Sequence, residues 1–212
     1  TLAALSSLAL LGAAGAPAQT AYPSQPIKFI VPYPAGGTTD VLARILAAAL
    51  QEAIPGSTFV VDNRPGGAAV VGTQAVAQAA ADGYTLALGN NQTHAANAAM
   101  LPSLPFDPIA DFTPISFLAS TPNVLVVNKQ LGVTSLRELI ALAKSKPNQL
   151  TFGSSGIGTS LHMSGELFNE MAGVQIRHIP YKGRAQSLPD LLGGRISMLF
   201  DNLSSALPLI QQ

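Results

Sequence analysis

Short β-rich runs alternate with longer helical patterns along most of the chain, and this alternation limits the fold more than any other feature of the sequence. In the first half we expect strands at residues 27–33, 58–62 and 84–88, with helices at residues 39–53 and 69–80 between them. The strands are short and rich in β-branched and aromatic residues, whereas the helices carry apolar residues three and four positions apart. The resulting β-α-β-α-β order is typical of a parallel sheet that helices cover.

A proline-rich stretch, residues 101–122, interrupts this alternation. Proline removes a backbone donor and breaks helices, so we predict a winding connection there, with one short strand at residues 113–119. The alternation then resumes, with strands expected at residues 124–128, 150–154, 176–181 and 196–201 and helices at residues 135–144, 159–171 and 186–192. The sequence therefore predicts two α/β lobes joined by an irregular crossover.

The two ends of the sequence differ from the rest. Residues 1–18 carry no charge, and an apolar run of about ten residues, too short to cross a bilayer as a helix, leads into Ala16-Pro17-Ala18. This pattern is typical of a secretory signal peptide, so we expect an exported protein cleaved near Ala18, with a signal peptide truncated at its N-terminus. The alternative is a hydrophobic N-terminal helix of the fold. Residues 204–212 are expected to begin a further helix that the sequence cuts short.

Charged residues are scarce and balanced, since they make up 10% of the chain and comprise 11 basic and 11 acidic residues. A chain with no basic excess and no Lys/Arg run cannot track a phosphate backbone, which excludes nucleic acid as a partner. The sequence contains no cysteine. Disulfides, thiolate metal sites and a cysteine nucleophile are therefore excluded as well.

The sequence VPYPAGGTTD at residues 31–40 ends a predicted strand and begins a predicted helix. Ligands bind at this position in open α/β sheets. Gly36 and Gly37 allow a ligand to approach the backbone, and Asp40 falls in the first turn of the helix. The free N–H groups of that turn and the helix dipole favour a carboxylate. A tight strand-to-helix turn without a ligand is the alternative.

A second turn rich in glycine and hydroxyl groups, FGSSGIGTSLH at residues 152–162, has the same position between a strand and a helix. Its hydroxyls and unhindered N–H groups predict a second anion-binding turn. The nucleophile elbow G-x-S-x-G would require glycine in place of Ile157, and the dinucleotide and P-loop patterns fail too. The turn therefore predicts binding rather than catalysis.

No residues in the sequence combine a base, a nucleophile and an orienting group. His94 and His178 lack the spacing of metal ligands. We therefore expect no catalytic residue, no metal and no cofactor. The alternative is an exported α/β hydrolase that uses Ser154 or Ser155 with His162. A cytoplasmic effector-sensing domain of the same fold stays open only if residues 1–18 are retained.

Five blocks follow one another along the chain: VPYPAGGTTD, VDNRPGGAAVVGTQAVAQAAADGYTLALG, LPFDPIADFTPI, FGSSGIGTSLHMSGELF and IPYKGRAQSLPDLLGGRISMLFDN. In this order they resemble the Bug family, the extracytoplasmic solute receptors of tripartite tricarboxylate transporters, from about Tyr22 to the last residue. The resemblance implies a type II periplasmic-binding-protein fold, in which two α/β lobes enclose a ligand cleft. It also implies a periplasmic, non-enzymatic monomer that captures a carboxylated small molecule for the membrane permease subunits of the transporter.

The same resemblance implies a division of the chain and a set of ligand-binding residues. Residues 19–121 would form the N-terminal part of lobe one, residues 122–203 lobe two, and residues 204–212 the start of a return to lobe one, whose remainder is missing. The loop at residues 33–40 would hold the carboxylate through backbone N–H groups and ordered water, and residues 154–162 would face it. The implied ligand-binding residues are Tyr33, Pro34, Ala35, Gly36, Gly37, Thr38, Asp40, Asn90, Thr93, Ser154, Ser155, Gly158, Thr159, His162, Tyr181, Lys182 and Asp201.

The sequence departs from the family pattern in two places. The run of small residues after the Arg-Pro-Gly turn is short, and Asn90-Asn91-Gln92 is an unusually polar version of its loop, which would alter ligand choice. The solute stays open between a dicarboxylate, a tricarboxylate, an amino acid and an aromatic acid. Arg64, Arg177 and Arg184 are candidate partners for a second carboxylate.

Overall fold

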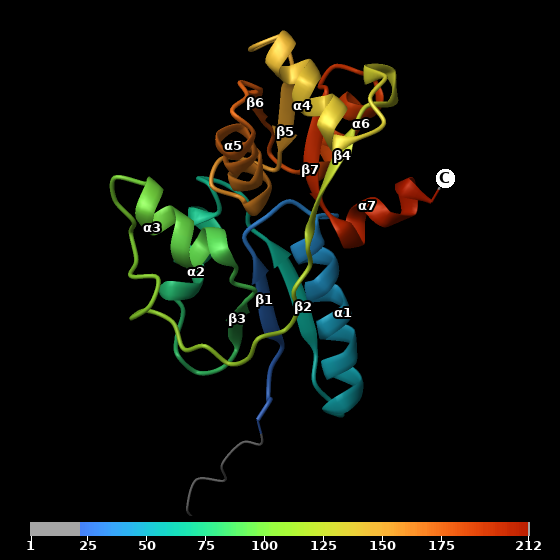
Figure 1. Ribbon diagram of the computed structural model, residues 1–212. Helices are drawn as coiled ribbons and strands as arrows, with labels where there is room; N and C mark the ends of the chain where they lie inside the picture. Colours follow the sequence, from blue (N-terminus) through green and yellow to red (C-terminus); the bar gives the residue numbers. More distant parts are fainter. Residues whose placement is uncertain (1–21, 212) are drawn as a thin grey trace, which may run out of the picture.

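The computed structural model describes residues 22–211, so the segment expected to be a signal peptide, residues 1–18, lies outside the described chain. Within residues 22–211 two α/β units follow one another, as the alternation of the sequence predicts (Figure 1). No helix in this range combines the length and the apolar character needed to cross a membrane.

The first unit contains a three-stranded parallel sheet. β1 (Ile27–Val31) lies at its centre, between β2 (Phe59–Asn63) and β3 (Thr85–Ala87). Four of the five residues of β1 are buried, as expected for a central parallel strand that is covered on both faces. Helix α1 (Thr38–Ala53) packs on β1 and β2, and α2 (Val70–Ala77) packs on β1 and β3.

The second unit contains a four-stranded sheet in the order β4-β7-β5-β6. Its strands are β4 (Asn123–Val127), β5 (Thr151–Ser154), β6 (Arg177–Pro180) and β7 (Met198–Asn202). β5 runs parallel to both of its neighbours, whereas β4 runs antiparallel to β7. The helices α4 (Leu136–Ser145), α5 (Ser160–Ala172) and α6 (Arg184–Leu192) and a single 3-10 turn, η2 (Lys129–Leu131), connect the strands.

The segment between the two units differs from the prediction. A π-helical turn, η1 (Gln92–Ala96), and the short helix α3 (Asn97–Met100) replace the expected loop after β3. The strand predicted at residues 113–119 is wrong, because this segment is not paired to any described strand. A β-rich run becomes a strand only when a neighbouring strand completes its hydrogen-bond ladder. Ile115 and Phe117 are accordingly 79% and 83% exposed.

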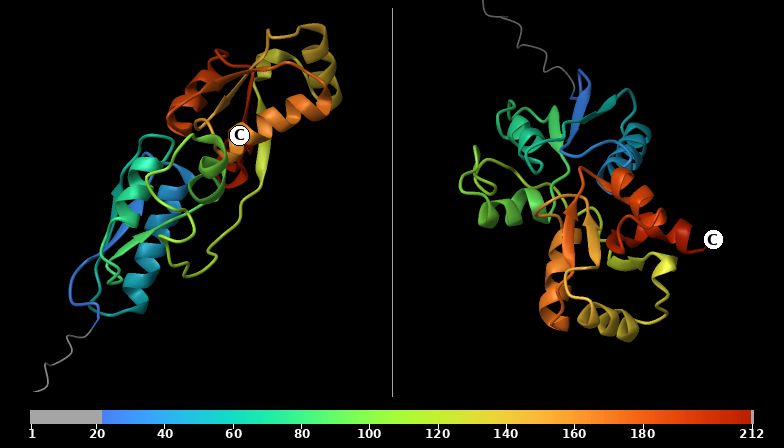
Figure 2. Two further views of the ribbon diagram at one scale, coloured as in Figure 1. Left: turned by 90° about the vertical axis from the view of Figure 1, so that its left-hand side faces the viewer. Right: turned by 90° about the horizontal axis from the view of Figure 1, so that it is seen from above.

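Two segments of the chain, called the crossings, lie between the two sheets. The first leads into β4, and the second follows β7 and leads into α7 (Leu203–Ile210), which packs on β4 and β7 and is bonded to lobe one through Thr38. The two crossings lie together, because the Leu203 amide donates a hydrogen bond to the Pro122 carbonyl at 2.9 Å. Figure 2 shows the two lobes end to end with these crossings between them. The lobe boundaries at residues 121 and 203 stay predictions.

The core of the second lobe forms around Phe152, which is fully buried on β5. Its ring stacks on His178 of the neighbouring strand at a centroid distance of 4.8 Å. Gly165 of α5 faces the same ring so closely that a Cβ atom there would lie 2.1 Å from a ring carbon of Phe152. The glycine therefore sets how closely α5 approaches the sheet.

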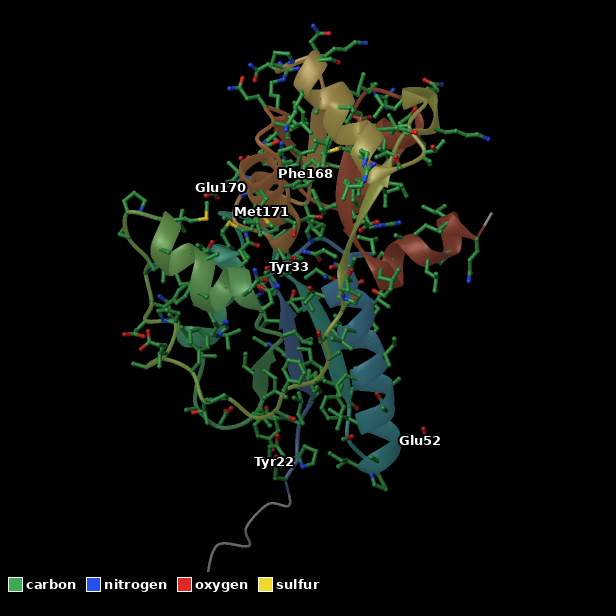
Figure 3. The ribbon with its side chains drawn as sticks, in the orientation of Figure 1. Tyr22, Tyr33, Glu52, Phe168, Glu170 and Met171 are labelled. Carbon is green, nitrogen blue, oxygen red and sulfur yellow. The ribbon has the colours of Figure 1, made fainter. Side chains whose placement is uncertain are left out.

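We expect Gly165→Ala to lower the free energy of unfolding by about 3 kcal/mol, since the added methyl forces the helix or the Phe152 ring to move. Urea unfolding followed by circular dichroism measures the change. Glu170→Ala, at an exposed position of the same helix (Figure 3), serves as the control and should change stability by less than about 0.5 kcal/mol. Equal stability of Gly165→Ala and wild type would contradict the close packing of α5.

Candidate functional site

A cavity of about 100 Å³ lies between the two lobes. The carboxyl ends of β1, β6 and β7 and the turns that follow β3 and β5 surround it. Figure 3 places Tyr33, which follows β1, at the centre of the molecule, between the two sheets. Ten of the predicted ligand-binding residues line this cavity: Tyr33, Pro34, Ala35, Gly37, Thr38, Asn90, Ser155, Thr159, Lys182 and Asp201.

In lobe one, the turn between β1 and α1 presents its backbone to the cavity. Gly37 is the N-cap of α1, and it has no side chain to shield the helix end. Gly36 has a φ of 79°, a conformation that favours glycine. Its amide donates to the carboxylate of Asp40 at 2.9 Å, which fixes the shape of the turn. The N–H groups of Thr38 and Thr39 begin the helix without an intrahelical partner.

Tyr33 is the principal polar side chain from lobe one. Its hydroxyl lies 2.9 Å from Oε1 of Gln92 and 3.0 Å from Oδ1 of Asn90, and it accepts a hydrogen bond from Nδ2 of Asn90 at 2.8 Å. Burial raises the pKa of Tyr33 to about 12, and the hydrogen bond with Asn90 offsets part of that rise. The phenol is therefore protonated and uncharged at neutral pH.

In lobe two, the turn between β5 and α5 presents Ser155 and Thr159 to the cavity. Thr159 is the N-cap of α5, and its hydroxyl accepts a hydrogen bond from the His162 amide at 3.3 Å. Ser160 in the first helical turn also lines the cavity. The predicted second turn therefore faces the first one across a shared space.

Two further helices of the described chain begin at the same cavity. Gly183, the N-cap of α6, and Asn202, the N-cap of α7, both line it. Together with α1 and α5, the N-termini of four helices converge from the two lobes. Each helix N-terminus carries free N–H groups and about half a positive charge, so the arrangement favours a negatively charged guest.

The charged side chains at the cavity add to this preference. Lys182 and Arg184 line it, and Asp201 is the one acidic residue among its described lining residues. Asp201 is 3% exposed and is neutralised by Arg184, whose Nε lies 2.6 Å from its Oδ2. Arg184 also donates to the Ser205 carbonyl at 2.8 Å. The guanidinium of Arg184 is therefore already bonded within the protein, whereas the ammonium group of Lys182 forms no ion pair with any described residue.

The structure places four of the predicted residues behind the cavity wall. Asp40 is buried and bonded to Gly36 and Arg44, so it supports the first turn. Gly36 supplies the turn itself and does not line the cavity. Thr93 is 1% exposed, and its hydroxyl accepts a hydrogen bond from the Asn90 amide at 2.9 Å. Tyr181 points away, because its hydroxyl donates to Asp190 at 2.7 Å.

Ser154 and His162 also lie away from the cavity, because both serve the turn after β5. Ser154 is 1% exposed, and its hydroxyl lies 2.7 Å from Nε2 of His178. The same oxygen accepts a hydrogen bond from the Gly156 amide at 3.1 Å. Nδ1 of His162 accepts a hydrogen bond from the Gly158 amide at 3.3 Å. Gly158 therefore belongs to the turn and does not line the cavity. These residues therefore hold the shape of the turn and do not face the cavity.

His162, Glu166 and His178 form a group whose ligand atoms lie within 4.8 Å of one another and could hold a metal ion. The His162 and His178 rings lie 4.2 Å apart, and burial together with the charge of His162 lowers the pKa of His178 to about 4. A metal at Nε2 of His162 would require a proton on Nδ1, which would break the Gly158 hydrogen bond. The hydrogen bonds of His162 and His178 instead support the turn after β5. The expectation of no metal stays a prediction.

Sequence reasoning missed several residues that line the cavity. Gln92, Gly183 and Asn202 are the most informative of them. Gly183 lies shortly after β6 and Asn202 is the last residue of β7, so the rule that ligands gather at the carboxyl ends of strands could have found them. Gln92 belongs to the polar run expected to alter ligand choice, but the position of its side chain depends on the π-helical turn η1.

The chain is similar in sequence to a known protein family. The family model described as "Tripartite tricarboxylate transporter family receptor" matches residues 42–212. Protein BugT of Bordetella pertussis is 40% identical over 205 residues, which make up 96% of this chain and 63% of BugT. The sequence thus spans less than two thirds of that relative.

Two solved structures resemble this one closely. "R. palustris Rpa4515 with adipate" matches with a TM-score of 0.86 and 43% identity, over 90% of this chain and 63% of that one. "MatC (Rpa3494) from Rhodopseudomonas palustris with bound malate" matches with a TM-score of 0.82 and 29% identity, over 90% and 64% of the two chains. These matches confirm the predicted two-lobed periplasmic-binding-protein fold and the resemblance to Bug proteins. The chain belongs to the family of tripartite tricarboxylate transporter receptors.

Proposed function

We propose that the protein is a periplasmic receptor that captures a small carboxylate between its two lobes and passes it to the membrane permease subunits of a tripartite tricarboxylate transporter. The convergence of four helix N-termini on one cavity carries this proposal. The adipate and malate named for two structural relatives are both dicarboxylates, which supports the same class of guest. We propose that the protein acts as a monomer and performs no chemistry on the solute.

The magnitudes are sufficient for a receptor. A micromolar dissociation constant corresponds to about −8 kcal/mol. A hydrogen bond to a charged group contributes about 1.5–3 kcal/mol, and a helix N-terminus adds about 0.3–1 kcal/mol. Three or four backbone or hydroxyl donors and the four helix ends can therefore hold one carboxylate, and Lys182 is available for a second one.

The alternative, a hydrolase that uses Ser154 or Ser155 with His162, finds no support in the geometry. Ser154 is buried and bonded to His178 rather than to His162. Ser155 reaches the cavity, but no hydrogen bond joins it to a histidine among residues 22–211. A nucleophile needs a base within hydrogen-bond reach, and neither serine combines that base with access to a substrate.

We expect adipate or malate, at 100 times its dissociation constant, to stabilise the folded protein by about 2.7 kcal/mol. Thermal unfolding with a panel of dicarboxylates, tricarboxylates, amino acids and aromatic acids measures this effect. Adipamide, which has the length of adipate but no charge, is the matched control. Stabilisation by adipamide equal to that by adipate, or no stabilisation by any acid, would contradict the proposal.

A further inference from the structure

The side chain of Gln92 joins the two lobes. Its Nε2 donates a hydrogen bond to the Ile157 carbonyl of lobe two at 2.7 Å. Its Oε1 accepts one from the Tyr33 hydroxyl of lobe one at 2.9 Å. Gln92 is 2% exposed, so both bonds are shielded from water. One amide group thus connects the central tyrosine of the cavity to the turn that faces it.

The chemistry of the partners fixes the orientation of this amide. The Ile157 carbonyl can only accept a hydrogen bond, so the NH₂ group of Gln92 must point toward it. The oxygen then points toward the Tyr33 hydroxyl, which is protonated because burial raises the pKa of Tyr33 to about 12. Tyr33 therefore holds Gln92 in the orientation that reaches lobe two.

The contact is separate from the two crossings. Gln92 belongs to η1 and Ile157 to the turn between β5 and α5, whereas the crossings precede β4 and follow β7. Gly158, next to Ile157, packs at this point with a φ of 82°, and a Cβ there would lie 3.4 Å from Nε2 of Gln92 and 3.6 Å from the sulfur of Met100. A hydrogen bond between the lobes outside the crossings opposes separation of the lobes.

We propose that Gln92 is a positioning residue that fastens the turn after β5 to Tyr33 and so holds the cavity closed around its guest. The effect on the guest rests on the proposed receptor function, whereas the effect on the separation of the lobes does not. Gln92 belongs to the polar run Asn90-Asn91-Gln92 that follows β3.

The test measures the separation of the lobes without any ligand. The experiment uses the protein expressed at the length that its gene encodes. Residues 1–212 contain no cysteine, so Ile45→Cys on α1 and Met171→Cys on α5 provide two exposed sites for spin labels. Gln92→Glu keeps the shape of the side chain, but it places a second acceptor against the Ile157 carbonyl. We expect the ratio of closed to open molecules to fall about tenfold in this variant.

Two further variants make the result specific. Gln92→Met keeps the length without either hydrogen bond and should also reduce the closed population, which covers the case in which Gln92→Glu does not fold. Gln149→Glu introduces the same change at an exposed position and should leave the distances unchanged. Wild-type distances in both Gln92 variants, or the absence of a closed population in the wild type, would overturn the inference.

A second arm separates this inference from the proposed function. The dissociation rate of adipate or malate, whichever stabilises the wild type, should rise about tenfold in Gln92→Glu. A changed separation of the lobes without binding of any carboxylate would uphold the role of Gln92 and refute the receptor function. An unchanged separation of the lobes with normal carboxylate binding would refute the role of Gln92 and uphold the receptor function.

Discussion

Gly37→Val is expected to abolish carboxylate binding while the protein stays folded. Gly37 lines the cavity as the N-cap of α1, and it leaves the helix end open to the guest. A branched side chain at this position fills the space in front of the N–H groups of the first turn. We expect the dissociation constant of adipate or malate to rise more than about a hundredfold, since several charged hydrogen bonds are lost together. Isothermal titration calorimetry measures it.

The backbone at Gly37 tolerates this change. Its φ of −80° and ψ of 167° are open to any residue, and a Cβ would meet only the Pro34 carbonyl, at 3.5 Å. Valine is a poorer N-cap than glycine, so a stability loss of about 1 kcal/mol is expected and circular dichroism should show a folded protein. Gly37→Ala is the graded control and should weaken binding less. Wild-type affinity in Gly37→Val would contradict the assignment of this turn to the ligand.

Arg184→Ala is expected to lower the free energy of unfolding by about 3 kcal/mol. The change leaves Asp201, which is 3% exposed, without the guanidinium that neutralises it. Removal of one partner from a buried ion pair is strongly destabilising, because the remaining charge is neither solvated nor paired. It also removes the hydrogen bond to the Ser205 carbonyl, which ties α6 to α7. Urea denaturation measures the loss.

The pair formed by Arg195 and Asp190 provides a matched control. Both pairs contain an arginine and an aspartate, but the side chains of Arg195 and Asp190 are 67% and 25% exposed. Solvent screens an exposed pair, so Arg195→Ala should cost less than about 1 kcal/mol. Equal losses in Arg184→Ala and Arg195→Ala would show that the buried position of Asp201 does not matter to the fold.

Most elements of the fold could be predicted from the sequence because they depend on local periodicity. The buried run at residues 27–33 and the helix that follows it are examples, since their side-chain patterns fix which face is covered. The failure at residues 113–119 has the opposite cause. That run has the composition of a strand, but strand formation requires a partner that composition alone does not supply.

The candidate site was predictable in its location and less so in its individual residues. Neighbouring Ser154 and Ser155 look alike in the sequence, yet Ser154 faces His178 and only Ser155 lines the cavity. Successive residues at the end of a strand point to opposite faces, so a shift of one position separates a residue that binds from one that supports. Asp40 was likewise predicted to bind the ligand, but its hydrogen bonds with Gly36 and Arg44 hold it behind the turn.

The sequence by itself determined that two glycine-rich turns follow strands and begin helices, because the tight turn, the helix start and the free N–H groups are all properties of neighbouring residues. Only the tertiary structure decided that these turns share one cavity with the ends of α6 and α7. It also decided that Gln92 reaches Ile157, 65 positions further along the chain. Such contacts depend on how rigid elements pack against one another, and local spacing along the chain carries no record of that packing.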